Sequence, residues 1–193
     1  MNAEALGKAI SEATRFLQGI HNDVRSQIGS LDRLLGARGW VPAEPNKVSD
    51  HLGNQLSDSK WKWVPDYVYR CYTRTEEAQV ARHVVVVFWY FTAELGEAYQ
   101  VATCAAVAAR LNAPLPPASL LPRDWNASGV YEATGQSTVP VVLSSAQIKP
   151  LLPTAVEAAG FVLPLCELTS DAILEDRLVS PILAAEAALG VKP

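Results

Sequence analysis

Most of the signatures by which a function is recognised are missing from this 193-residue chain. It has no glycine-rich phosphate loop, no dinucleotide fingerprint and no Gly-x-Ser-x-Gly nucleophile motif. Its histidines, cysteines and carboxylates show no metal-ligand spacing. The sequence therefore assigns no catalytic residue, no metal ligand and no cofactor, and we expect a protein that is not an enzyme.

Cysteine, charge and long apolar runs are also scarce. Three cysteines (Cys71, Cys104 and Cys166) without short spacing predict buried reduced thiols rather than disulfides or a zinc site. A formal net charge of -4 argues against a dedicated nucleic-acid binder. No apolar run is long enough to cross a bilayer, and residues 1–8 are too mixed for a signal peptide. We therefore expect a cytoplasmic protein without membrane contact.

One short apolar run organises the rest of the chain. Four valines from Val84 are followed by the aromatic residues Phe88, Trp89, Tyr90 and Phe91. β-Branched and aromatic side chains favour strands, and the absence of polar alternation indicates that both faces are covered. The run predicts the central strand of a sheet, near residues 82–92.

The N-terminal segment predicts the clearest helix, over residues 4–36. Its apolar residues recur at steps of three and four: Leu6, Ile10, Ala13, Leu17, Ile20, Val24, Ile28, Leu31 and Leu35. Such a helix is longer than a small domain is wide, so either Gly19 or Gly29 bends it back or a second chain covers an overhang. We expect burial on the sheet for 17–35 and a partner contact for 6–13.

Further elements follow from alternation and from turn residues. We expect a half-buried strand at 67–72, a third strand at 98–111 (where a helix is the alternative), short extended pieces at 130–134 and 139–143, a helix at 153–159 and a strand at 161–168. Pro140 places the second extended piece at an edge. Thr169 or Ser170 caps a final helix, which Pro181 kinks or restarts.

Aromatic and basic residues are interleaved shortly before the central strand. The candidate binding residues are Trp61, Trp63, Tyr67, Tyr69, Arg70, Tyr72 and Arg74, with Lys60, Lys62 and Arg82 nearby. Trp, Tyr and Arg are the preferred anchors of protein interfaces, and the same mixture also stacks nucleic-acid bases. A third interpretation is that the aromatic rings line the core while the cations are solvated.

Together these patterns predict one α+β domain over residues 1–193. An antiparallel sheet, with its central strand near 82–92, is packed by a long N-terminal helix and a C-terminal helix. The preferred function is a non-enzymatic binding protein, an accessory, inhibitory or adaptor subunit with a protein partner in a homo-oligomer or a hetero-complex. Its candidate contacts are the aromatic and basic residues above, together with Leu6 and Ile10. The alternative is a small enzyme or a nucleotide- or ligand-binding domain with Asp66, Arg70 and His83 around a pocket.

Overall fold

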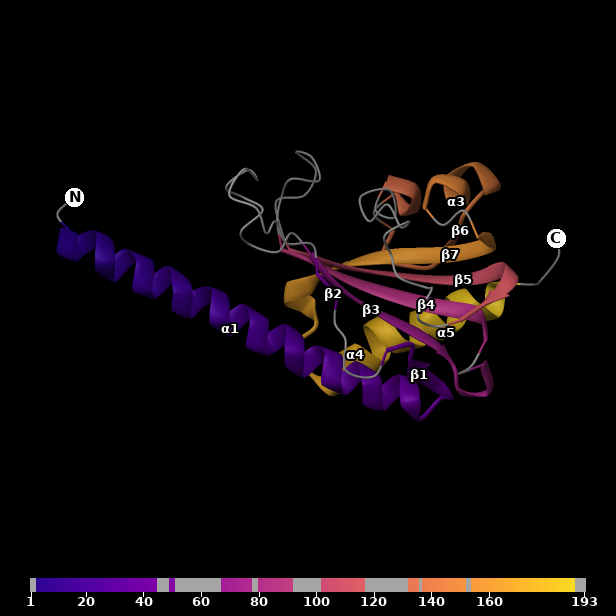
Figure 1. Cartoon of the computed structure of the whole chain (residues 1–193), viewed down its shortest axis with the longest axis horizontal. Coiled ribbons are helices and arrows are strands. Elements are labelled where there is room, and N and C mark those ends of the chain that lie inside the picture. The colour runs from indigo at the N-terminus through magenta and orange to yellow at the C-terminus, as the bar shows by residue number, and fades with distance from the viewer. Residues whose placement is uncertain are drawn as a thin grey trace.

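The computed structural model describes residues 3–44, 49–50, 67–77, 80–91, 102–116, 132–135, 137–151 and 154–189. Within this part the chain has the expected α+β architecture: a seven-stranded sheet, antiparallel in every pair, with helices on both faces (Figure 1). Along the sheet the strands run β1-β3-β4-β5-β7-β6, and β2 also pairs with β3.

The elements have the following bounds. The helices are α1 (Ala3–Gly36), α3 (Ser145–Leu151), α4 (Asp171–Leu174) and α5 (Ser180–Ala188). The strands are β1 (Trp40–Pro42), β2 (Ser49–Asp50), β3 (Tyr67–Arg74), β4 (Ala81–Tyr90), β5 (Thr103–Leu115), β6 (Val141–Val142) and β7 (Ala155–Pro164). Two 3₁₀ turns, η2 (Thr75–Glu77) and η5 (Leu165–Glu167), and a π-helical turn, η6 (Glu175–Val179), complete them.

Strand β4 is the central strand that the apolar run predicts. It pairs with β3 on one side and β5 on the other, and every residue from Val84 to Tyr90 is buried. Val85, Val87 and Trp89 join the core under α1 and the C-terminal helices, whereas Val86 and Phe88 join the core on the opposite face. The prediction of a strand covered on both faces is confirmed.

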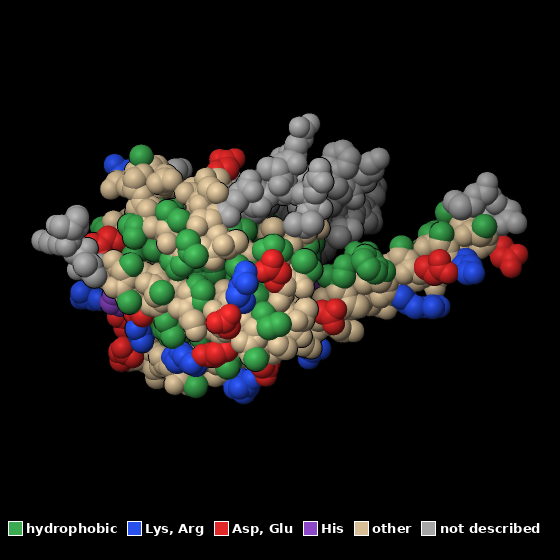
Figure 2. All heavy atoms as spheres, turned by 180° about the vertical axis from the view of Figure 1, so that it is seen from behind, with side chains coloured by type: hydrophobic (Ala, Val, Ile, Leu, Met, Phe, Trp, Pro, Cys, Tyr) green, Lys and Arg blue, Asp and Glu red, His purple; other side chains and the backbone are tan. Residues whose placement is uncertain are grey.

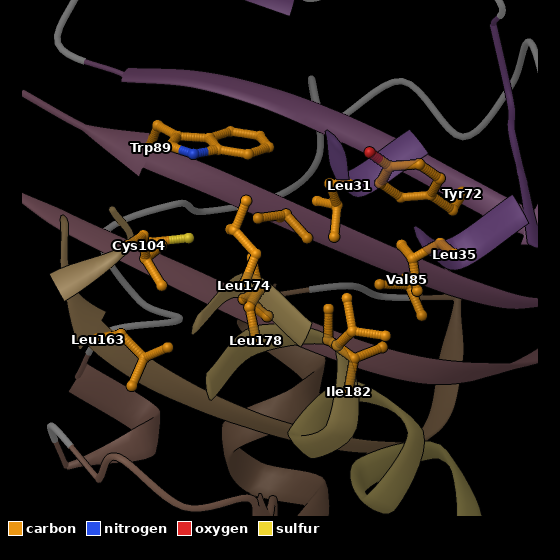
Figure 3. Close-up of a cluster of buried hydrophobic side chains, with 14 of the residues drawn as sticks. Leu31, Leu35, Tyr72, Val85, Trp89, Cys104, Leu163, Leu174, Leu178 and Ile182 are labelled. Carbon is orange, nitrogen blue, oxygen red and sulfur yellow. The ribbon is translucent and has the colours of Figure 1, made fainter. Parts of the chain in front are cut away.

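One hydrophobic core packs the C-terminal half of α1 against the C-terminal helices. Leu31 and Leu35 of α1 gather with Leu174, Leu178 and Ile182 of the C-terminal helices above the sheet (Figure 3). All of these side chains are buried. The end of α1 is therefore an integral part of the domain.

The alanine-rich segments are strands. Strand β5 confirms the third strand that we expected at 98–111. The helix expected at 153–159 is wrong, because β7 occupies most of this segment and pairs with β5 along its length. Alanine favours helices locally, but a long ladder of sheet hydrogen bonds outweighs that preference. A Cβ at Gly160 would lie 3.0 Å from the carbonyl oxygen of Ala106, so β7 approaches β5 too closely for a larger residue.

The short elements follow their local sequences in most places. Strand β6 lies at the sheet edge, as Pro140 predicts, but Glu132–Thr134 forms a helical turn where we expected extended chain. Ser170 caps α4 by accepting a hydrogen bond from the Ile173 backbone N–H at 3.3 Å. A π-turn then leads directly into α5, whose first turn holds Pro181. Val179 and Ser180 keep helical backbone angles, so the chain continues as a helix through this point and does not restart.

Helix α1 is continuous over 34 residues. At 1.5 Å per residue it is about 51 Å long. Figure 1 shows it as a rod that crosses one side of the domain and extends well beyond the sheet. The alternative of a bend at Gly19 or Gly29 is therefore wrong, and the overhang is present.

Candidate protein interface

The two halves of α1 differ in burial. Every residue from 4 to 19 is exposed, whereas Val24, Ile28, Leu31 and Leu35 are buried. Burial begins later than we expected, because Leu17 is still 37% exposed. The large apolar side chains of the outer half have exposed fractions of 46% for Leu6, 59% for Ile10 and 70% for Phe16. We call Leu6, Ile10, Ala13, Phe16 and Leu17 the projecting stripe.

Four residues of the projecting stripe, all but Phe16, have the spacing of a coiled-coil seam. From Leu6 to Val24 the steps alternate between four and three residues, which is the heptad pattern of helices that pack side by side. The charged residues Lys8, Glu12 and Arg15 lie outside this seam, and Lys8 pairs with Glu12 at 3.9 Å along the helix. Figure 2 shows apolar side chains along the projecting rod beside separate charged groups. The outer half is therefore amphipathic without a described partner for its apolar side.

A groove of about 690 Å³ lies where α1 meets the domain. Its lining comes from α1, from the ends of the β4 and β5 segments and from the η5 region: Ile20, Asp23, Val24, Ser26, Gln27, Phe91, Ala102, Leu165, Cys166, Leu168 and Thr169. Ile20 and Val24 continue the heptad spacing of the projecting stripe. The stripe and the groove therefore form one continuous apolar surface.

Gln27 fixes the floor of this groove. Its side-chain oxygen accepts a hydrogen bond from Trp89 Nε1 at 3.1 Å, and its nitrogen donates to the Leu168 carbonyl oxygen at 2.9 Å. One carboxamide thus joins α1, the central strand and the turn before α4. Cys166, which we expected to be buried, is exposed in the groove wall.

Strand β3 divides the aromatic and basic residues predicted as a binding cluster. Trp61 and Trp63, with Lys60, Lys62 and Asp66, lie outside the described residues. Because side chains alternate along a strand, Tyr67 and Tyr69 face one core, whereas Arg70, Tyr72 and Arg74 face α1 and the C-terminal helices. These residues do not form one surface.

Arg70 and Tyr72 are held inside the domain by Asp32 of α1. Arg70 is only 4% exposed, and its Nε and Nη2 donate to the two carboxylate oxygens of Asp32 at 3.1 and 2.6 Å. The Tyr72 hydroxyl donates to Asp32 Oδ1 at 2.8 Å. Burial opposes the charge of Arg70, but the hydrogen bonds and the charge of Asp32 raise its pKa. Burial and the neighbouring Asp32 carboxylate also raise the pKa of Tyr72 well above 10.

Arg74 makes internal contacts at the other end of β3. Its guanidinium lies 4.6 Å from the ring centre of Trp40 and forms an ion pair with Glu186 of α5. Tyr67 and Tyr69 are half-buried and pack with Phe88, with ring centres 6.1 and 5.9 Å away. Both sets of contacts tie β3 to its own domain, so the projecting stripe is the more accessible candidate interface.

Arg70 and His83, the two described residues of the proposed alternative pocket, are not among the residues that line the groove. Arg70 is engaged by Asp32, and His83 Nδ1 lies 2.9 Å from Glu77 Oε1. Glu77 also accepts hydrogen bonds from the backbone N–H groups of Arg82 and His83 at 2.8 Å. Partial burial opposes ionisation of Glu77, but these hydrogen bonds lower its pKa. His83 and Glu77 thus fasten the β3–β4 turn.

Sequence reasoning found the stripe but not the groove. Phe91, Ala102, Leu165 and Leu168 come from three separate segments, and nothing in their local sequence says that they meet. The only available signal was the continuation of the heptad spacing through Ile20 and Val24. Comparison with protein-family models, curated proteins and solved structures found no match for this chain.

The described residues contain neither a metal-binding cluster nor a membrane-spanning helix. Among them, no three His, Cys, Asp or Glu side chains lie close enough together to hold a metal ion. None of the helices in the described ranges is both long and apolar enough to cross a bilayer. Among the described residues, the projecting stripe and its groove are therefore the best candidate functional surface.

Proposed function

We propose that this chain is a non-enzymatic binding protein, an accessory, inhibitory or adaptor subunit, which engages a protein partner through the projecting stripe of α1. The observation that carries the proposal is the exposure of Leu6, Ile10 and Phe16 on a helix that leaves its own domain. Each Å² of apolar surface left in water costs about 25 cal/mol, so covering this stripe favours association.

The helical state of the outer half also favours a partner. An isolated helix of about 15 residues is only marginally stable in water, and most helices in proteins gain stability by packing an apolar face. Here the buried C-terminal half of α1 provides the helical nucleus from which the outer half extends. A partner provides the missing packing for residues 4–19.

The groove fits this function better than a small-molecule site. Its volume of about 690 Å³ lies in the range of ligand pockets, but such pockets carry polar groups that converge on the ligand. The Gln27 carboxamide is already committed on both ends to Trp89 and Leu168. The other polar lining residues are Asp23, Ser26 and Thr169. The rest of the lining is apolar and continues the stripe, as an extension of a helix-binding surface would.

A photo-crosslinking amino acid placed along α1 in the native host tests the proposal. At Ile10 it lies in the stripe, and at Ser11 it lies one residue away on the neighbouring face. We expect protein adducts at position 10 and a much lower yield at position 11. Equal yields at both positions, or no adduct at position 10, would contradict a protein interface through this stripe.

The cellular location remains a prediction. Cys71, Cys104 and Cys166 are free thiols, which fits a reducing compartment such as the cytoplasm. The acidic net charge of -4 supports a protein partner over a nucleic acid.

A further inference from the structure

The apolar seam of α1 is symmetric about residue 15. Reversing the helix about this point brings Leu6 opposite Val24, Ile10 opposite Ile20, and Ala13 opposite Leu17. Each pair joins the two kinds of seam position that face each other in antiparallel coiled coils. The seam is therefore complementary to its own reversed copy over 19 residues, or about 28 Å.

The charges of the outer half permit this pairing. Between residues 4 and 19 the helix carries two acidic and two basic side chains: Glu4, Glu12, Lys8 and Arg15. All four lie away from the seam and its immediate flanks, which over residues 6–24 are Gly7, Ala9, Thr14, Phe16, His21 and Asp23. In the reversed pair His21 lies beside Gly7 of the second copy and Asp23 beside its Ala9, so no like charges meet.

The groove provides a place for the end of the partner helix. In the reversed arrangement, Leu6 of one copy lies over the groove of the other at the level of Val24. Val24 itself is only 4% exposed, so the accessible part of this contact is the neighbouring groove lining. The two most exposed side chains, one Phe16 from each copy, lie beside the two-fold axis. A symmetric pair thus places the end of each helix at the groove of the other copy and covers both stripes with the same contacts, as closed two-fold dimers do.

We propose that the partner of the projecting stripe is a second copy of this chain, paired antiparallel along α1 with residue 15 at the two-fold axis. This inference rests on the proposed function and names its partner. It commits to a dimer in which the two domains lie at opposite ends of a short helical pair.

Sedimentation velocity between about 1 and 200 µM, the range of weak specific association, tests the dimer. We expect the wild type to move from monomer to dimer and the Ile10→Glu, Leu17→Glu variant to stay a monomer. The matched control, Ser11→Glu with Gln18→Glu, adds the same charge one residue outside the seam and is expected to keep the dimer. A monomeric wild type throughout, or a dimer unaffected by the first variant, would overturn the inference.

Disulfide trapping tests the register without relying on a disruptive variant. In a Cys166→Ser background, Phe16→Cys is expected to form a linked dimer on mild oxidation. Leu6→Cys is expected not to, because the two copies of residue 6 lie about 27 Å apart along an antiparallel pair. Linkage through residue 6 with none through residue 16 indicates a parallel pair and overturns the proposed arrangement.

The two experiments separate this inference from the proposed function. If crosslinking at Ile10 captures a different protein while the chain alone remains a monomer, the second copy is wrong and the protein interface stands. If position 10 gives no adduct and the chain is a monomer, both proposals fail.

Discussion

The two halves of α1 have the same sequence period but different surroundings. From Val24 onward the apolar side chains are buried against the sheet and the C-terminal helices, whereas from Leu6 to Leu17 they are exposed. The apolar period predicts a helix with one apolar side in both halves. It does not say whether that side is covered by the same chain or by another, because coverage depends on the size and position of the domain.

Removing an apolar side chain should therefore lower the free energy of unfolding much more in the inner half of α1 than in the outer half. Leu31→Ala leaves a cavity in a fully buried site and is expected to lower the free energy of unfolding by about 2–5 kcal/mol. Leu6→Ala is expected to change the free energy of unfolding of the monomer by less than about 0.5 kcal/mol. Urea unfolding at a concentration where the protein is monomeric measures both. Similar losses in the two variants would show that the outer half also packs on its own domain.

Removing one carboxylate from each half of α1 gives a second comparison of the two halves. Asp32→Ala leaves the Arg70 guanidinium buried with its main ionic partner removed, and we expect a loss of about 2 kcal/mol. The loss falls below the upper range for buried pairs because Asp32 is itself 29% exposed. Glu12→Ala in the outer half removes only an exposed pair with Lys8 and is expected to cost less than about 0.5 kcal/mol. Chemical unfolding of the two variants in parallel would detect the difference.

The Tyr72–Asp32 hydrogen bond predicts an alkaline pH dependence in the buried half. The fold raises the pKa of Tyr72, so this group contributes stability below about pH 10, where unfolded tyrosine ionises, and loses it as the pH rises further. Tyr72→Phe is expected to be about 1 kcal/mol less stable than the wild type at pH 7. Unfolding curves from pH 8 to 11 should show this gap closing above about pH 10. A constant gap would mean that Tyr72 ionises equally in both states.

Replacing glycines of α1 by alanine is expected to give the smallest change in the free energy of unfolding. A Cβ at Gly29 or at Gly7 meets no atom within 4 Å, so alanine fits at both positions. Gly29→Ala in the inner half is expected to raise the free energy of unfolding by about 0.5–1 kcal/mol. Gly7→Ala is expected to raise helicity by circular dichroism without changing the unfolding midpoint of the monomer. Equal midpoint shifts would show that α1 unfolds as one unit with the domain.

Local patterns predicted those elements whose sequence and environment agree. The valine and aromatic run specified a central strand because no polar residue interrupts it, and Ser170 with Asp171 specified a helix start. The alanines of β7 were misjudged because their partner strand, β5, is distant in the chain. Local sequence alone cannot report such pairing.

The candidate site shows the same limit. Alternation along β3 predicted its two faces, but not that Arg70 is buried, because its partner Asp32 is 38 residues away. The exposed stripe was predicted from helix length, since a 34-residue helix exceeds the domain that it packs on. The groove depends on tertiary contacts among separate segments, for which the sequence carries no short-range signal.

Residue-by-residue hydrogen exchange along α1 compares its two halves most directly. In dilute monomer we expect strong amide protection after residue 24 and weak protection before residue 20, because only the inner half is packed on its own domain. Once the stripe is covered by its partner, residues 6–20 should gain protection while residues 24–35 change little. Uniform protection along the whole helix in the dilute monomer would contradict the division of α1 into a structural half and a binding half.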